Sequence, residues 1–234
     1  MINTSFLINT FFLALKGIPV TLKITFVTLL FSSIFSLFIA LSKITGNNIV
    51  SKITGVYVSL VRSTPVVLQI LFLYSLLPSL LNYLVNIVLK LGWDIFAINP
   101  IFYAYIIFIF NTTAVLSEVF RSAILTVNKG QMESALTSGL SRRQSYSHII
   151  IPQAFKVALP NISNTVVGLL KSTSLAFMMT VKDVTAIAKT EAAFGYNYIE
   201  AYLDIMVIYI LLCTILQIIF RTIEKNFEKK WGKH

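Results

Sequence analysis

The sequence predicts an all-helical membrane protein with five transmembrane helices, folded as one domain over residues 1–234. Of the 234 residues, 56% are hydrophobic and only 12% are charged, whereas soluble domains carry about 25% charged residues. The few charges are also bunched, so long uncharged stretches separate them. A helix crosses the bilayer core with roughly 20 apolar residues, and these stretches reach that length. A soluble protein is therefore excluded.

The first three spans are uncharged stretches between charged residues. The bounding pairs are Lys23 and Lys43, Arg62 and Lys90, and Asp94 and Glu118. Each stretch is about as long as a bilayer-crossing helix. We expect these spans at about residues 20–43, 63–89 and 95–118.

The last two spans are less uniform. A fourth, at about 157–181, is interrupted only by Lys171, and a fifth, at about 201–221, reaches spanning length if it starts near Ala201. Residues 6–15 are apolar but too short to cross. We expect them to lie along the membrane interface or to dock on the bundle.

The distribution of Lys and Arg predicts an outside N-terminus and a cytoplasmic C-terminus. Cytoplasmic segments of membrane proteins carry an excess of these residues. With the N-terminus outside, thirteen of the nineteen Lys and Arg residues fall on the cytoplasmic side. We therefore interpret the net charge of +10 as a sign of topology, and we expect no nucleic-acid partner because no basic patch is interleaved with aromatic residues.

The longest stretch outside the spans, residues 121–156, is expected in the cytoplasm. Gly130 and Gly139 bracket a short helix, and Ser141 is the expected N-cap of a second helical piece that ends before Pro152. A short helix with small residues on one face suits insertion into a groove of another protein. A loop with incidental helicity is the alternative.

Signatures of enzymes are missing from the sequence. His148 and His234, the two histidines, lie far apart without Cys, Asp or Glu at ligand spacing, so we expect no metal site. No phosphate-binding Gly-x-x-x-x-Gly-Lys-Ser/Thr loop occurs. We expect no enzymatic activity and no cofactor, so ATP-derived energy would have to come from a separate subunit.

Four motifs follow one another along the chain. They are Arg62-Ser63-Thr64-Pro65, Glu118-x-x-Arg121, a segment with Gln131, Glu133, Ser134, Ala135 and Gly139, and Lys171-Ser172-Thr173-Ser174-Leu175. They resemble, in that order, the Arg-Gly-Thr-Pro, Glu-x-x-Arg, Glu-Ala-Ala-loop and Lys-Asp-Thr-Ser-Leu motifs of permease subunits of bacterial ABC importers for polar amino acids. Within that family the chain looks most similar to L-cystine permeases.

The motifs also depart from the family pattern. Serine replaces Gly at Ser63, Ala at Ser134, Leu at Ser138 and Asp at Ser172, and Thr113-Ala114-Val115 stands where Gly-Ala-Tyr is usual. Ser and Ala differ little in volume, so a close helix contact survives at Ser134. The change at Ser172 removes an acid beside Lys171.

The resemblance implies the membrane fold of a type I ABC importer in a bacterial inner membrane. It also implies three kinds of protein partner: ATPase subunits that bind ATP and Mg²⁺, a second permease subunit in a homo- or heterodimer, and an external or periplasmic solute-binding protein. Residues 121–156 would be the coupling segment. The residues expected to dock into the ATPase are Gln131, Glu133, Ser134, Ala135 and Gly139.

Ionisable and polar residues inside spans are candidates for the substrate pathway. They are Asn111, Thr112, Glu118, Lys171, Ser172, Thr173 and Ser174. A lysine with a cluster of hydroxyl groups suits a zwitterionic amino acid. The alternative is structural, with Lys171 paired to Glu118 or to a carbonyl.

Four further residues are candidates for gating or for anchoring to the membrane surface, namely Arg62, Thr64, Pro65 and Arg121. Pro65 disfavours helical geometry at Thr64, so a helix can begin there. Arg62 can equally reach lipid phosphates.

The sequence thus predicts the transmembrane subunit of an ATP-driven importer of polar amino acids, with L-cystine as the narrower substrate. Two alternatives are a non-transporting membrane subunit for assembly or sensing, and an ion-coupled secondary carrier. The absence of an internal sequence repeat weakens the carrier.

Overall fold

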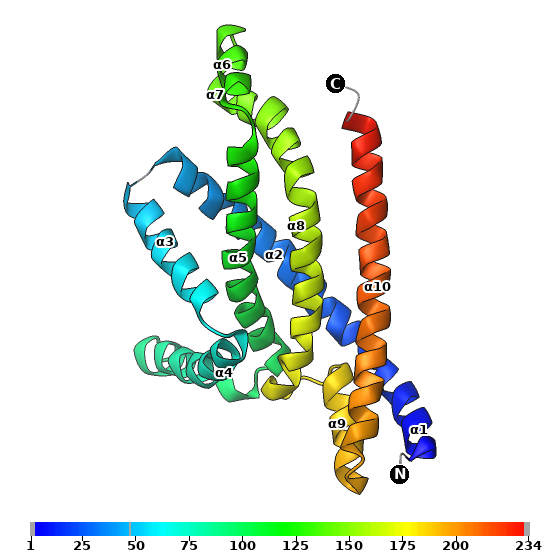
Figure 1. Cartoon of the computed structure of the whole chain (residues 1–234). Coiled ribbons are helices and arrows are strands. Elements are labelled where there is room, and N and C mark those ends of the chain that lie inside the picture. The colour runs from blue at the N-terminus through cyan, green and yellow to red at the C-terminus, as the bar shows by residue number, and fades with distance from the viewer. Residues whose placement is uncertain (1–2, 47, 232–234) are drawn as a thin grey trace.

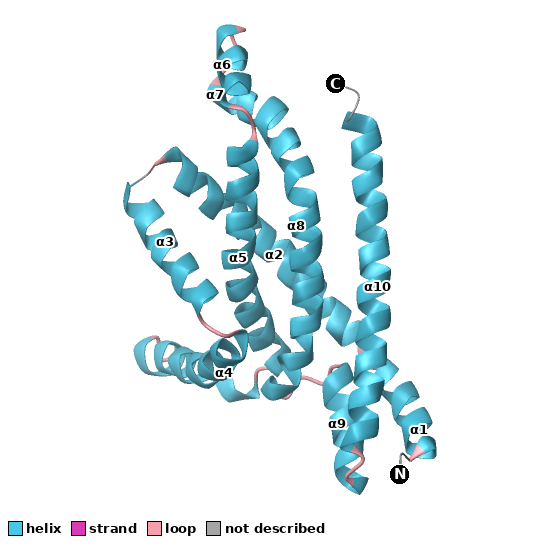
Figure 2. Ribbon diagram, in the orientation of Figure 1, coloured by secondary structure: helices cyan, strands magenta, loops and turns pink. Residues whose placement is uncertain are grey.

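The computed structural model describes residues 3–46 and 48–231. Within these residues every regular element is a helix, and Figure 2 shows no strand in this part of the chain. The prediction of an all-helical protein is confirmed.

Ten α-helices and four short segments of 3-10 or π-helix make up the described chain. The α-helices are α1 (Thr4–Leu15), α2 (Ile18–Thr45), α3 (Asn48–Ser63), α4 (Val66–Asn82), α5 (Pro100–Thr126), α6 (Lys129–Thr137), α7 (Arg142–Ser145), α8 (Ile151–Ser172), α9 (Val184–Gly195) and α10 (Tyr198–Trp231). The short segments are η1 (Tyr83–Val88), η2 (Ile95–Ala97), η3 (Tyr146–Ile150) and η4 (Thr173–Met179).

Helix α5 is the centre of the bundle. The side chain of Asn99 accepts a hydrogen bond from the N–H of Ile101, and Pro100 occupies the first turn; both features favour the start of a helix. Helices α2 and α8 pack along α5 (Figure 1). Ile107 and Phe108 of α5 are fully buried in this core. Because lipid tails are as apolar as these side chains, close packing rather than exclusion from water favours such contacts in a membrane.

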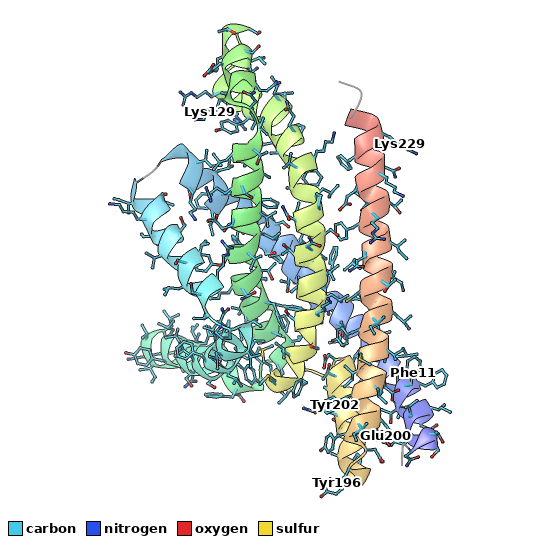
Figure 3. All side chains as sticks on the ribbon, viewed as in Figure 1. Phe11, Lys129, Tyr196, Glu200, Tyr202 and Lys229 are labelled. Atoms are coloured by element: carbon cyan, nitrogen blue, oxygen red, sulfur yellow. The ribbon has the colours of Figure 1, made fainter. Side chains whose placement is uncertain are left out.

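The molecule has two distinct ends. Helices α6 and α7 and the C-terminal part of α10 lie at one end, and α1 and α9 lie at the other (Figure 1). Lys129 and Lys229 mark the first end and Tyr196 the second (Figure 3). The first end carries the segment predicted to be cytoplasmic.

Four segments of the described chain are long and apolar enough to cross a membrane: Ile18–Ile44, Val66–Val88, Pro100–Thr126 and Tyr198–Phe227. They overlap the first, second, third and fifth predicted spans, although Pro100–Thr126 begins and ends later than the third, which was expected at 95–118. Helix α8 covers most of the fourth with 22 residues but is not among the four. Five spans and the orientation of the termini stay predictions.

The link between the first two predicted spans is a helix rather than a surface loop. Helix α3 packs against both α2 and α5. Pro65 ends this helical path and forms the N-cap of α4, with φ −62° and ψ 133°. Helix α4 then runs across the bundle instead of along α5 (Figure 1).

Two helix ends differ from the sequence-based expectation. The α-helix of the fourth predicted span ends at Ser172, and the chain continues as η4 to a left-handed Thr180 with φ 57°. Pro152 does not end a helix but lies in the first turn of α8. The first turn tolerates proline because its N–H groups have no partner inside the helix.

The N-terminal helix α1 docks on the bundle, as one of the two expected arrangements has it. It packs against α9 and α10. The backbone N–H of Asn3, its N-cap, donates to Oε1 of Glu200 at 2.7 Å, and Glu200 and Phe11 lie at this end in Figure 3. After α1, the backbone of Gly17 comes so close to that of α9 that an added Cβ would stand 2.4 Å from the nitrogen of Val184.

A buried polar cluster joins α9, α10 and η4. The carboxylate of Asp183 accepts a hydrogen bond from the N–H of Ala186 at 2.8 Å and thereby caps α9. The hydroxyl of Tyr209 donates to the same carboxylate at 3.3 Å and lies 3.4 Å from the hydroxyl of Thr173. Asp183 is fully buried and lies outside the expected spans, and burial raises its pKa to about 6.

Candidate functional site

A pocket of about 470 Å³ with several polar side chains in its wall lies between α4, α5 and α8. Its polar lining comes from the side chains of Asn111 and Thr112 on α5 and of Asn161, Asn164, Thr165 and Ser172 on α8. Val66, Phe108, Val115, Val119, Gly168 and Leu169 complete the wall. A mixed wall with a few amide and hydroxyl groups can bind a small polar molecule.

The pocket follows from the amphipathic character of α8. Asn161, Asn164 and Gly168 are exposed on one side of the helix, whereas Val166 and Leu170 are buried on the other. Residues three, four and seven positions apart share a helix face. Amide side chains are costly against lipid, so this face has to meet water or protein.

Asn111 belongs to a hydrogen-bonded chain that reaches the end of α3. Its Nδ2 donates to Oε1 of Gln69 at 2.8 Å. Nε2 of Gln69 lies 2.7 Å from the carbonyl oxygen of Val61, and 3.0 and 2.8 Å from the carbonyl oxygen and Oγ1 of Thr64. The amide has two hydrogens, so one of its N–H groups is shared between two of these three acceptors. The Arg-Ser-Thr-Pro motif and the pocket are therefore directly connected.

The hydroxyl cluster of the fourth predicted span is divided between two surroundings. Ser172 lines the pocket, although its hydroxyl donates to the carbonyl of Gly168 at 3.0 Å. Thr173 is fully buried and faces Tyr209, and the hydroxyl of Ser174 donates to the carbonyl of Lys171. Lys171 is exposed in the last turn of α8 and is not part of the pocket wall.

Glu118 forms ion pairs other than the one considered from the sequence. Its carboxylate pairs with the ammonium of Lys43 and, at 2.8 Å, with the guanidinium of Arg121. Within the described chain Glu118 pairs with Lys43 and Arg121 and not with Lys171, which lies in the last turn of α8. The Glu-x-x-Arg motif therefore ties α2 to α5.

Three of the four candidate gating or anchoring residues lie around the break between α3 and α4, whereas Arg121 lies on α5 and pairs with Glu118. Arg62 is exposed in the last turn of α3. The hydroxyl of Thr64 donates to the carbonyl of Leu60 at 3.0 Å, while Pro65 starts α4. Thr64 and Pro65 thus shape the backbone next to the pocket.

The expected coupling segment forms two short helices with a sharp turn. Within α6, Ala135 is buried and Met132 packs against a cluster that includes Ile150 and Ala154, while Glu133 and Ser134 are exposed. Gly139 has φ +86°, a conformation that favours glycine. Ser141 caps α7 in a capping box with Gln144. The short helix, the turn and the cap were all predicted from the sequence.

A second hollow, of about 790 Å³, lies beside the coupling segment. It is bounded by Gln131, by His148 and Lys156 near the start of α8, and by Glu224 and Phe227 of α10. Among the described residues, no group of three or more His, Cys, Asp and Glu side chains is placed to hold a metal ion.

Several residues of the site were not singled out from the sequence: Gln69, Asn161, Asn164, Thr165 and Lys43. For the α8 residues a signal was present, because Asn161, Thr165, Gly168 and Ser172 recur at helical spacing within a largely apolar stretch. Gln69 and Lys43 act through contacts with distant segments, which no local pattern reveals.

Comparisons with known proteins agree with this picture. A family model described as "Binding-protein-dependent transport system inner membrane component" matches residues 32–229. The chain is 32% identical over 212 residues to the L-cystine transport system permease protein TcyL of Bacillus subtilis, with 91% of this chain and 86% of that protein covered. It is 33% identical over 204 residues to the nopaline transport system permease protein NocM of Agrobacterium fabrum, with 87% and 83% covered.

A solved structure shares the fold. It is described as an amino acid ABC transporter with histidines, and it matches with a TM-score of 0.80 and 25% sequence identity over 97% of this chain and 99% of that chain.

Proposed function

Because the chain belongs to the family of binding-protein-dependent transport system inner membrane components, we propose that it forms half of the pathway of an ATP-driven importer of polar amino acids. Membership confirms the resemblance drawn from the four motifs. The chain is a multi-pass permease component of the amino-acid ABC importer type, and the non-transporting subunit and the ion-coupled carrier are not favoured. The bacterial inner membrane is the location that the family implies.

The polar face of α8 is the observation that carries the proposal. Asn161 and Asn164 are exposed on a helix packed into a bundle of membrane-spanning length. Exposed amides on such a helix need water or a protein partner. A second permease subunit facing the 470 Å³ pocket would supply both, by enclosing a water-filled path between two α8 helices.

The coupling segment supports a link to an ATPase. Glu133, Ser134 and Leu136 are exposed on α6, whereas Met132 packs this helix against the bundle. An exposed helix face on a rigid support is suited to a groove of a partner protein. ATP and Mg²⁺ would bind to that partner, and its closure would move α5 and α8 through the turn at Gly139.

The opposite end of the molecule is where a solute-binding protein would deliver the substrate, if the N-terminus lies outside as predicted. L-cystine is the proposed substrate because the sequence motifs and the relative TcyL both point to it. NocM, a nopaline permease, shows that similar chains serve other amino-acid derivatives.

Uptake by the reconstituted complex tests the proposal. Proteoliposomes with this chain, its ATPase and its binding protein should accumulate radiolabelled L-cystine, arginine or glutamine only when ATP is present on the side of the membrane that carries the ATPase. Liposomes lacking the ATPase are the control. Uptake that persists without the ATPase would contradict the importer and favour an ion-coupled carrier, and no uptake of any of the three would contradict the proposed function.

A further inference from the structure

Gln69 holds a central place in the hydrogen-bonded chain beside the pocket. Its side chain is 8% exposed, and its amide connects the end of α3 with Asn111 on α5. Carbonyl groups at the end of a helix lack partners inside that helix. Gln69 supplies the missing donors where Pro65 interrupts the path from α3 to α4.

The orientation of the Gln69 amide is fixed by its three neighbours at α3, because all three are acceptors. Two are the carbonyl oxygens of Val61 and Thr64. The third is Oγ1 of Thr64, whose own proton is donated to the carbonyl of Leu60. Only an N–H group satisfies such neighbours, so Nε2 of Gln69 has to face α3 and Oε1 has to face α5.

The orientation of Asn111 follows from that of Gln69. Oε1 of Gln69 accepts but cannot donate, so it requires the NH₂ group of Asn111, which it meets at 2.8 Å. The carbonyl oxygen Oδ1 of Asn111 is then turned away from Gln69. Within the described chain Oδ1 has no hydrogen-bond partner, and Asn111 is half-buried in the pocket wall.

A fixed acceptor in a partly enclosed pocket selects a donor. An ammonium group is the strongest donor that an amino acid offers, and hydrogen bonds to charged groups are the stronger ones. On the opposite wall, the amide side chains of Asn161 and Asn164 have no partner within the described chain, so they can rotate to donate to a carboxylate. The two walls thus match the two ends of a zwitterion.

We infer that Gln69 is a positioning residue that locks the amide of Asn111 so that its carbonyl oxygen accepts a hydrogen bond from the ammonium group of the transported amino acid. The inference rests on the proposed function and adds the polarity of the site to it. The hydrogen-bonded chain that sets this polarity runs from the end of α3, through Gln69, to the carbonyl oxygen of Asn111 in the pocket wall.

Binding to the complex without its binding protein tests the inference. The permease, purified with its ATPase in lipid nanodiscs, is titrated with whichever of L-cystine, arginine or glutamine the wild type imports, and with the N-acetylated form of that amino acid. Wild type should bind the free amino acid well and the N-acetylated form poorly. Asn111→Leu should weaken binding of the free amino acid about 10- to 100-fold and bring the two affinities close together.

Asn111→Asp distinguishes the two possible polarities. Aspartate cannot donate to Oε1 of Gln69, so the overall affinity should fall, but it keeps an acceptor for the pocket and the preference for the free ammonium form should persist in this variant. If the NH₂ group of Asn111 faced the substrate carboxylate instead, Asp would repel it and abolish binding. Loss of binding in Asn111→Asp together with retained binding in Asn111→Leu would therefore overturn the inference.

Gln69→Met tests the positioning role, because Met keeps the length and packing of the side chain but releases Asn111. We expect binding to weaken about 3- to 10-fold and the discrimination against the N-acetylated form to shrink. On the Asn111→Leu background the same change should have no further effect; full additivity would refute the role of Gln69. Where Gln69→Met does not fold, Gln69→Asn replaces it, since that amide can still donate to α3 but is one methylene too short to reach α5.

Ser122→Ala is the matched control on α5, because the Ser122 hydroxyl is exposed and bonds only to the carbonyl of Val119. It should leave both affinities unchanged. Import by the wild type separates the two levels of failure. If the wild type imports none of the amino acids, the proposed function fails; if it imports one and the Asn111 variants keep wild-type discrimination, only the inference about Gln69 and Asn111 fails.

Discussion

Replacing Gly17 by alanine should loosen the contact between the start of α2 and α9. An added Cβ would lie 2.4 Å from the nitrogen and 2.7 Å from Cα of Val184, and 2.5 Å from the carbonyl carbon of Asp183. All three are backbone atoms, so no side-chain rotation can relieve the overlap. Gly17 itself has φ −80° and ψ −16°, which alanine adopts freely, so any effect comes from the overlap alone.

The magnitude follows from the displacement that is needed. The two backbones have to separate by about 1 Å before the new methyl group reaches ordinary contact, and overpacking of this kind costs about 1 to 3 kcal/mol. The upper value applies here because both sides are backbone. For a chain of this size, about 3 kcal/mol lowers the melting temperature by roughly 6 to 12 °C.

Cys213 provides the assay. It is the only cysteine of the chain and is buried in α10 with 7% exposure, so a thiol-reactive fluorescent dye reports unfolding of the detergent-solubilised protein. Gly55→Ala is the matched control, because nothing lies within 4 Å of the Cβ it would add in α3. It should raise stability by about 0.5 to 1 kcal/mol. Equal melting temperatures for the two variants would refute the close contact at Gly17.

Three further changes have defined outcomes. Glu118→Gln leaves the ammonium of Lys43 and the guanidinium of Arg121 without their shared carboxylate. The dye assay should therefore show a loss of stability of about 1 to 3 kcal/mol, whereas the exposed control Glu133→Gln should show none. A Glu118→Gln variant as stable as the wild type would show that solvent screens these ion pairs. Gly139→Val puts a β-branched residue at φ +86°, which costs about 1 to 3 kcal/mol locally. ATP-dependent uptake should fall at least about tenfold, while membrane insertion stays unchanged. Normal uptake would contradict the docking role of the coupling segment. The pKa of Asp183 is raised by burial to about 6, so the folded state binds more protons than the unfolded state between about pH 4 and pH 6, and stability should fall as the pH rises through that window and then level off. Asp183→Asn keeps the cap of α9 and should remove the fall in melting temperature between about pH 4 and pH 6. If the melting temperature of the variant depends on pH as that of the wild type does, Asp183 does not contribute.

Much of the fold could be predicted from local features of the chain. The charges around each uncharged stretch indicated where α2, α4, α5 and α10 lie, because a bilayer-length helix cannot contain many of them. The turn at Gly139 and the cap at Ser141 were also predictable, since each depends on a residue type that the local backbone requires.

The candidate site was predictable only in part. Asn111, Thr112 and Ser172 were chosen as polar residues within apolar spans, and the structure brings these three together in one pocket. Thr173 was chosen by the same rule but is not part of the pocket wall, and its hydroxyl lies beside that of Tyr209. Adjacent residues on a helix point about 100° apart, so a cluster in the sequence does not share one surface.

The sequence by itself determined that this is a helical membrane protein. Hydrophobicity and the spacing of charges are local properties, and they decide which segments are stable in the bilayer core. The four motifs determined the family, since they are strings of residue types. Only the tertiary structure decided which partners the polar groups find. Glu118 of α5 pairs with Lys43 of α2, and Gln69 of α4 bonds to Asn111 of α5. Those contacts join residues 42 and more positions apart, and they depend on how helices pack rather than on any pattern within one helix.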